Sequence, residues 1–165
     1  MHKLIVGLSW WLSWWFLVAA SAACEPTLIP NTRVEDTSAN REVVDFIEKY
    51  RKALETRDTN ALLALASHNY FDDMGTPAGN DDIDYDDLKD ALKRLRNEVL
   101  GARYQISYRA VTYDTENRVL VDVLYTGWFR INTLNDEGPE WKRRLEPHRI
   151  VLAREDGQYR ILSGM

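Results

Sequence analysis

The chain has 165 residues, of which 45% are hydrophobic and 28% are charged, values that are ordinary for one globular domain plus a targeting segment. The formal net charge is −5, and it becomes −6 without residues 1–23, because that segment holds one lysine and no acid. This acidic balance argues against a nucleic-acid partner, whose phosphates would be repelled. A single cysteine excludes an internal disulfide framework.

The N-terminus has the layout of a secretory signal peptide. A short positive start precedes an apolar block over residues 4–19 and a small-residue run that ends at Ala23. The next residue, Cys24, completes a box that resembles the processing site of bacterial lipoproteins, although Ser21 stands where that pattern prefers an aliphatic residue. The resemblance implies a signal peptide over residues 1–23 and acylation of Cys24, for example with palmitate. It also implies a protein anchored in the bacterial cell envelope, facing the periplasm or the exterior.

Two other fates for this segment remain open. A general signal peptidase could cut after Ala22 or Ala23, or the apolar run could stay in place as a membrane helix near the lower length limit for spanning. Residues 24–39 contain two prolines and little periodicity, so we expect a lipidated tether that holds the domain off the membrane.

Three helices are predicted at the start of the domain, residues 40–165. The first begins at the candidate N-cap Asn40 and ends near Arg57, with apolar residues at helical spacing. The second covers residues 60–67. A third begins after Asp84, whose side chain is a candidate cap, and Gly101 is expected to stop it.

From Ala102 onward the hydrophobic period changes to two, which predicts strands over residues 103–114, 118–132, 141–154 and 159–164. The Asp156-Gly157 pair predicts a hairpin turn before the last strand. The inward face of the longest strand is expected to carry Val119, Val121, Val123, Tyr125, Gly127, Phe129 and Ile131. We expect Val121, Val123 and Phe129 to pack against the first helix. So long a strand must bend, and Gly127 is the expected place for a bulge or kink.

Helices followed by an antiparallel meander define an α+β domain. This order of elements over residues 40–165 resembles the nuclear transport factor 2-like superfamily, which includes ketosteroid isomerases and polyketide cyclases. The resemblance rests on element order and on no specific motif. It implies a cone-shaped, cystatin-like fold, in which three N-terminal helices pack on a curved antiparallel sheet of four to six strands. It also implies a homodimer through the sheet as a candidate assembly.

The best candidates for chemistry are Asp72 and Asp73. Enzymes of the superfamily place a general-base aspartate after the second helix, and FDDMG occupies that place here, so the resemblance implies Asp73, or less well Asp72, as catalytic. The alternative is that both carboxylates accept hydrogen bonds from backbone N–H groups in a turn. Tyr125 is a candidate hydrogen-bond donor inside the cone, and we expect it to line a ligand pocket with Phe129 and Tyr50.

No metal site or cofactor is expected. The acidic run over residues 81–87 has the initial spacing of a calcium loop, but Asp87 and Lys93 stand where that loop needs glycine and glutamate. His68 and His148 lie far apart in sequence, and nothing around them resembles a zinc site.

Three functions fit these patterns. The favoured one is a membrane-anchored lipoprotein whose domain binds a small apolar ligand or a protein partner, with no catalysis expected, because no complete catalytic set is visible. The second is an isomerase-like or cyclase-like enzyme with Asp73 or Asp72 as general base. The third is a structural envelope protein whose cone is filled by its own side chains.

Overall fold

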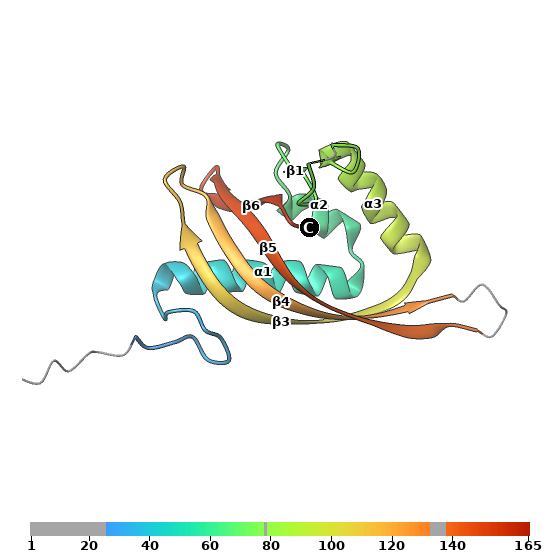
Figure 1. Cartoon of the computed structure of the whole chain (residues 1–165), viewed down its shortest axis with the longest axis horizontal. Coiled ribbons are helices and arrows are strands. Elements are labelled where there is room, and N and C mark those ends of the chain that lie inside the picture. The colour runs from blue at the N-terminus through green and yellow to red at the C-terminus, as the bar shows by residue number, and fades with distance from the viewer. Residues whose placement is uncertain (1–25, 78, 133–137) are drawn as a thin grey trace, which may run out of the picture.

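In the computed structural model, three helices lie on the concave side of a four-stranded antiparallel sheet (Figure 1). The structure describes residues 26–77, 79–132 and 138–165. The helices are α1 (Ser38–Thr56), α2 (Thr59–Leu65) and α3 (Tyr85–Glu98). The sheet has the order β3 (Val99–Tyr113), β4 (Val119–Ile131), β5 (Glu140–Glu155), β6 (Gln158–Ser163), and β1 (Phe71–Asp72) pairs separately with β2 (Ile83–Asp84). The predicted α+β class is confirmed.

Helix α1 begins earlier than predicted. Thr37 is its N-cap, and the Thr37 hydroxyl accepts a hydrogen bond from the Asn40 backbone N–H at 3.1 Å. Asn40, expected to be the cap, is a buried residue inside the helix. Its side-chain amide donates to the Glu35 carbonyl at 2.9 Å, and its Oδ1 accepts from the Tyr113 hydroxyl at 2.9 Å. These partners hold Asn40 in the interior, and the cap is Thr37, three residues before it.

The start of α3 matches the prediction and its end does not. Asp84 caps the helix in a capping box with Asp87. The helix then ends at Glu98, and β3 begins at the next residue, with no loop between them. Gly101 therefore does not stop the helix. It lies within β3 beside a register shift, under the Trp141 ring, where a Cβ would come within 3.5 Å of that ring.

Strand β4 has the predicted alternation but not the predicted bulge. Val119, Val121 and Val123 are buried on the helix side. Gly127 pairs in regular register with Tyr104 and Arg144, so the expected bulge there is wrong. The register shifts lie in β3, at Val99/Gly101 and Tyr108/Ala110, and in β5, at Val151/Leu152. Gly127 instead makes room for a side chain, because a Cβ on it would come within 2.8 Å of the Phe129 ring.

The main core lies between α1 and one end of the sheet, which we call the closed end. It contains side chains that are almost completely shielded from solvent: Val43, Ile47, Val121, Val123, Ile150, Leu152 and Ile161. The predicted burial of Val121 and Val123 is confirmed. Phe129 lies beyond this core and is half-buried, with its ring edge-on to Tyr104 at a centroid distance of 5.4 Å.

The segment before α1 packs against the body of the domain. Val34 is 2% exposed, and the Arg33 N–H donates to the Tyr108 carbonyl on the free edge of β3 at 3.2 Å. The part of the expected tether over residues 26–37 is therefore folded onto the domain. Cys24 and the N-terminal apolar block lie outside the described residues. None of the described helices has the length and apolar character needed to cross a bilayer.

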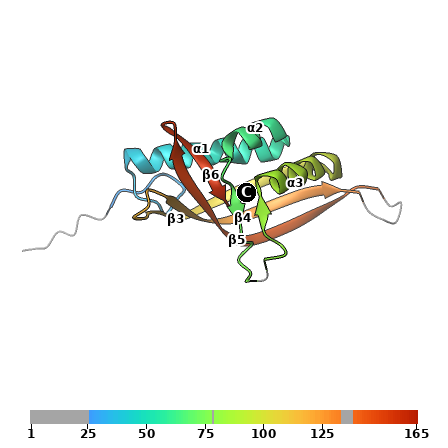
Figure 2. The same ribbon diagram turned by 90° about the horizontal axis from the view of Figure 1, so that it is seen from above.

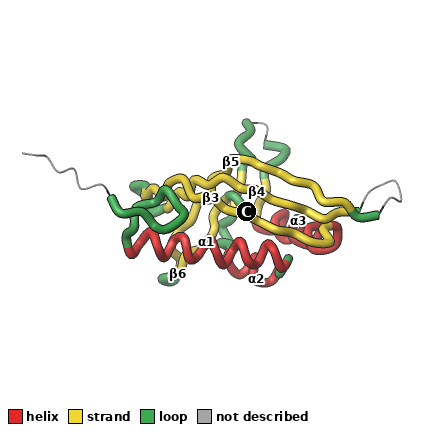
Figure 3. Tube along the Cα trace, turned by 90° about the horizontal axis from the view of Figure 1, so that it is seen from below, coloured by secondary structure: helices red, strands yellow, loops and turns green. Residues whose placement is uncertain are grey.

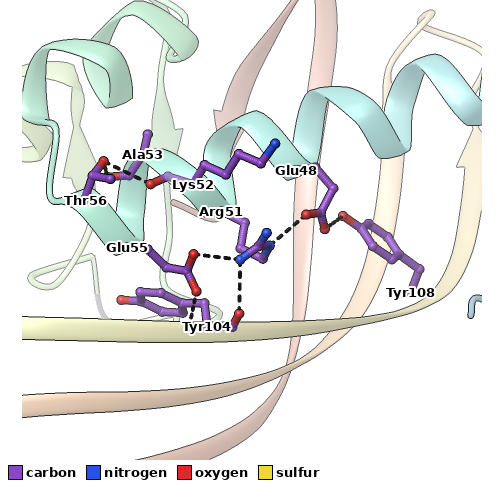
Figure 4. Close-up of polar contacts among 8 residues, drawn as sticks. All are labelled: Glu48, Arg51, Lys52, Ala53, Glu55, Thr56, Tyr104 and Tyr108. Atoms are coloured by element: carbon purple, nitrogen blue, oxygen red, sulfur yellow. Dashed lines mark hydrogen bonds and ion pairs between the residues drawn. The ribbon is translucent and has the colours of Figure 1, made fainter.

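A polar network joins α1 to the same edge of β3 (Figure 4). Arg51 bridges Glu48 and Glu55 at 2.7 Å each. Glu55 accepts a hydrogen bond from the Tyr104 N–H at 2.9 Å, and Glu48 accepts one from the Tyr108 hydroxyl at 2.8 Å. The helix thus pairs the Tyr104 N–H, a backbone group that a neighbouring strand would otherwise pair, and it also satisfies the Tyr108 hydroxyl. The bond to Glu55 fixes the position of Tyr104.

Candidate functional site

The other end of the sheet, which we call the open end, contains a cavity of about 270 Å³ between α1, α3 and the strands. In Figure 2, α3 lies beside α1 and α2 over this part of the molecule. The walls are mostly apolar and are formed by Tyr50, Leu54, Leu88, Ala91, Leu92, Leu95, Tyr104, Tyr125, Gly127, Phe129, Arg144, Glu146, His148 and Met165. Apolar walls with a few polar groups are typical of small-molecule sites.

Three tyrosines, Tyr50, Tyr104 and Tyr125, are among the polar residues of the pocket wall. Burial raises the pKa of Tyr104 to about 12. Burial also raises the pKa values of Tyr50 and Tyr125, and the hydroxyls of these two tyrosines interact with each other. All three phenols therefore keep their protons near neutral pH and act as donors. The Tyr125 hydroxyl is shielded from solvent. The Tyr50 hydroxyl lies near enough to affect its pKa, but the Tyr125 hydroxyl makes no hydrogen bond of regular geometry among the described residues. An unpaired buried donor costs free energy that a ligand acceptor reaching it would recover.

His148 is the second polar feature of the pocket. Its Nε2 lies 2.9 Å from the Gly164 carbonyl oxygen, and its ring packs against Tyr125 at a centroid distance of 5.1 Å. Because a carbonyl oxygen can only accept, Nε2 must carry a proton. In the neutral ring, Nδ1 is then an unprotonated acceptor, so this contact selects the tautomer.

Asp72 lies behind His148 and does not line the cavity. Its Oδ2 accepts a hydrogen bond from the Gly164 N–H at 2.7 Å and another from the Tyr70 hydroxyl at 3.3 Å, while Oδ1 accepts from the Met74 N–H at 3.0 Å. Gly164 thus joins Asp72 on one side to His148 on the other. A side chain at Gly164 would clash, since a Cβ there would lie 2.2 Å from the Arg149 carbonyl oxygen.

Asp73, the first sequence candidate for a general base, is exposed in a turn. Its carboxylate accepts a hydrogen bond from the Gly75 N–H at 2.9 Å, and it is not part of the pocket wall. This is the arrangement of the turn alternative raised from the sequence. The structure therefore separates both aspartates from the cavity.

The pocket mouth carries a pair of opposite charges on β5. Arg144 Nε lies 2.8 Å from Glu146 Oε2, and the arginine side chain is largely exposed. Exposed pairs of this kind hold each other weakly, so either group can turn towards a bound polar group.

The structure brings together the three pocket residues predicted from the sequence, Tyr50, Tyr125 and Phe129. Sequence reasoning missed His148 and the wall supplied by α3. His148 was weighed only as a zinc ligand, although it stands directly opposite Val123 in the sheet register and so shares the inward face. Among the described residues, no group of three or more His, Cys, Asp and Glu side chains is placed to hold a metal ion.

The architecture is the nuclear transport factor 2-like fold: three helices on a curved antiparallel sheet, with a pocket at its open end. A protein assigned as a dehydratase of the nuclear transport factor 2-like family, from Streptomyces avermitilis, shares it with a TM-score of 0.59. The two are 14% identical, and the match covers 76% of this chain and 92% of that one.

Two further solved structures share the fold. One is assigned as a scytalone dehydratase from Novosphingobium aromaticivorans, at 15% identity over 76% of this chain and 80% of that chain, with a TM-score of 0.64. The other is Aln2 from a Streptomyces species, at 13% identity over 81% and 92%, with a TM-score of 0.59. No protein-family model and no curated protein matches the sequence. Identities this low establish the fold and leave activity to be argued from the site.

Proposed function

We propose that the domain binds a small, largely apolar ligand that carries a hydrogen-bond acceptor oxygen. The observation that supports this most directly is the Tyr125 hydroxyl, which is buried beside an apolar cavity and makes no hydrogen bond of regular geometry among the described residues. A ligand oxygen that reaches this hydroxyl would accept its proton, while the rest of the ligand fills the apolar space.

The cavity volume sets the size of the ligand. A cavity of about 150 Å³ accepts benzene, and sites for drug-sized ligands begin at about 300 Å³. A cavity of about 270 Å³ lies between these limits, which favours a molecule of two fused rings. Residual space at the mouth, beside Arg144 and Glu146, suits a polar substituent.

A matched pair of small molecules tests this proposal. We expect 2-acetylnaphthalene to bind the full chain saturably and to bind more tightly than 2-ethylnaphthalene, which has the same shape without the oxygen. Tyr125→Phe should weaken binding of the acetyl compound about three- to tenfold, the range for one neutral hydrogen bond, and leave binding of the ethyl compound unchanged. Ala91→Trp, which fills the cavity, should abolish binding of both compounds. Binding that persists in this control variant would come from other apolar segments of the chain. Equal loss of both compounds in Tyr125→Phe would contradict the role given to the hydroxyl.

An enzymatic function is the second candidate, and one observation favours it. The Gly164 contact leaves Nδ1 of the neutral His148 ring unprotonated, and His148 lines the pocket. Beside a bound ketone, Nδ1 would take a proton from the carbon next to the carbonyl. Tyr125 would donate to the enolate oxygen, and the proton would then return to carbon. The dehydratase assignments of two structural neighbours agree with chemistry of this kind.

Hydrogen–deuterium exchange measures this step without knowledge of the natural substrate. In D₂O, the wild-type chain should accelerate exchange of the methyl protons of 2-acetylnaphthalene, followed by NMR. His148→Gln keeps a donor for the Gly164 carbonyl but removes the base, and should lower the acceleration by about 10²–10⁴-fold. Asp73→Asn is the matched control. If Asp73→Asn abolishes exchange and His148→Gln does not, the aspartate is the base instead.

The proposal includes the anchor expected from the sequence. Acylation of Cys24 would hold the binding domain at an envelope membrane. Mass spectrometry of the mature N-terminus tests it, since acyl chains on Cys24 add a defined mass that Cys24→Ala removes. An unmodified start at Ala23 or Cys24 would remove this part of the proposal without affecting the pocket.

A further inference from the structure

Arginines and tryptophans gather on the outer face of the sheet at its open end. The strands β4 and β5 extend here beyond α3, as Figures 1 and 3 show. Side chains on this face point away from the helices, because they alternate with the pocket residues along each strand. We call the group the outer patch; it consists of Arg103, Trp128, Arg130, Trp141, Arg143 and Leu145.

The sheet register stacks these side chains in rows across the strands. Arg103, Trp128 and Arg143 are direct neighbours in one row, and Arg130 pairs with Trp141 in the next. The Arg143 guanidinium lies 5.9 Å from the Trp128 ring, and that of Arg103 lies 5.4 Å from the Trp141 ring. These are cation–π contacts of the kind that arginine makes with tryptophan rings.

The inner face of the same strands is different. There Lys142 pairs with Glu140 at 3.0 Å, and Arg144 pairs with Glu146 at 2.8 Å. The three arginines of the outer patch have no carboxylate partner among the described residues, although the chain as a whole is acidic. The outer face is not without ion pairs, since Arg149 pairs with Asp122 at 2.7 Å further along the same two strands. The arginines of the outer patch have no such carboxylate neighbour in the part of the chain that the structure describes and can meet an anion supplied from outside the chain.

We propose that the outer patch docks on an anionic phospholipid surface. The guanidinium edges contact the lipid phosphates. Trp141, 49% exposed, and Leu145, 54% exposed, enter the interfacial region that tryptophan favours. This inference rests on the proposed anchor only for the way the domain is brought to the membrane, and it does not depend on the pocket.

Two features favour a lipid surface over a second copy of this chain. A face-to-face pair formed through the patch would bring like-charged arginines together, which opposes the sheet-mediated homodimer at this end of the sheet. In addition, the acyl chain proposed at Cys24 would hold the domain at a bilayer, so a lipid surface would be a nearby source of anionic groups for the patch.

Vesicle co-sedimentation of the full chain tests the proposal. Binding to phosphatidylcholine vesicles measures the part due to the N-terminus, and the increase when about a third of the lipid is phosphatidylglycerol measures the electrostatic part. Each arginine at the surface should contribute about fivefold in partitioning. Arg103→Gln combined with Arg143→Gln should therefore lower the anionic increment by about 25-fold, and high salt should remove it.

The control is a pair with the same charge change on α3, Arg94→Gln with Arg96→Gln, which are exposed on the other side of the sheet. It should retain most of the increment. An equal loss in both pairs would show that net charge alone acts, and would overturn the proposal. So would unchanged vesicle binding combined with altered self-association in sedimentation velocity, since that result assigns the outer patch to a second copy. Because all four positions are exposed, circular dichroism should show that every variant is folded.

Discussion

The two ends of the sheet have the same alternation of inward and outward residues, but one end contains a packed core and the other a cavity. At the closed end, β4 contributes valines that are at most 3% exposed beneath α1. At the open end, the same face continues through Tyr125, Gly127 and Phe129 and borders a cavity. The difference lies in what covers the strand, because α1 fills the concavity at one end, whereas α3 covers the other end and leaves space. Alternation therefore specifies the face of a residue, and only the tertiary cover specifies whether that face becomes core or pocket.

The strongest test of this comparison is a pair of large-to-small substitutions. Leu152→Ala at the closed end should lower the free energy of unfolding by about 2–5 kcal/mol, as expected for a fully buried leucine. Phe129→Ala at the open end should lower it by only about 1–2 kcal/mol, because the ring is half-buried and already borders empty space. Urea unfolding measures both. Equal losses would show that the two ends are packed alike.

The open end is also stabilised by the hydrogen bonds of Asp72, which lies outside the cavity wall and holds Gly164. Asp72→Asn should lower the free energy of unfolding by about 1–3 kcal/mol, since the new amide must leave one of its present donors unpaired. Because Gly164 connects Asp72 to His148, the same variant should alter the ¹⁵N shifts of the His148 ring. A loss of stability with unchanged ring shifts would restrict Asp72 to a structural role.

Alkaline pH should act through the tyrosines of the open end. A tyrosine in an unfolded chain has a pKa of about 10, whereas burial raises the pKa of Tyr104 to about 12. Below about pH 10 both states keep the proton and stability is unaffected. Between about pH 10 and 12 the unfolded chain ionises first, so stability falls. Tyr104→Phe should reduce that fall, as judged from urea midpoints at about pH 9 and pH 11. An identical fall in the variant would assign the effect to other groups.

The smallest effect is expected at Asp73. Its exposed turn tolerates asparagine, which retains an acceptor oxygen for the Gly75 N–H, so Asp73→Asn should change the free energy of unfolding by less than about 0.5 kcal/mol. The urea midpoint at about pH 8 gives the result. Stabilisation by more than about 1 kcal/mol would reveal a desolvated carboxylate and support Asp73 as a catalytic base.

Local signals in the sequence predicted much of the fold. The capping box at Asp84 and the turn at Asp156-Gly157 need only nearby residues, and both are present, with φ angles of 49° and 78° in the turn. Asn40 was misassigned because the Tyr113 hydroxyl, which donates to its side chain, comes from a residue 73 positions away.

The candidate site was predicted less completely, for the same reason. Tyr125 and Phe129 could be placed on the inward face from periodicity alone. His148 acquires its importance from Gly164, a neighbour that its own strand does not reveal. Gly127 looked like a bending point, yet its role is to accommodate a ring two residues away on the same strand.

The direct passage from Glu98 in α3 to Val99 in β3 has a mechanical consequence. Because no loop separates them, we expect helix and strand to move together about the register shift next to Gly101. Leu92 and Leu95 of α3 line the cavity, and Arg103 of β3 belongs to the outer patch. A ligand that displaces α3 on binding in the cavity would then also shift β3. Ligand binding on the inner face would in this way change the position of Arg103 in the outer patch. Inserting two glycines after Glu98 should uncouple α3 from β3. The hydrogen-exchange rates of the β3 amides, which we expect to change when 2-acetylnaphthalene binds the wild-type chain, should then stay the same.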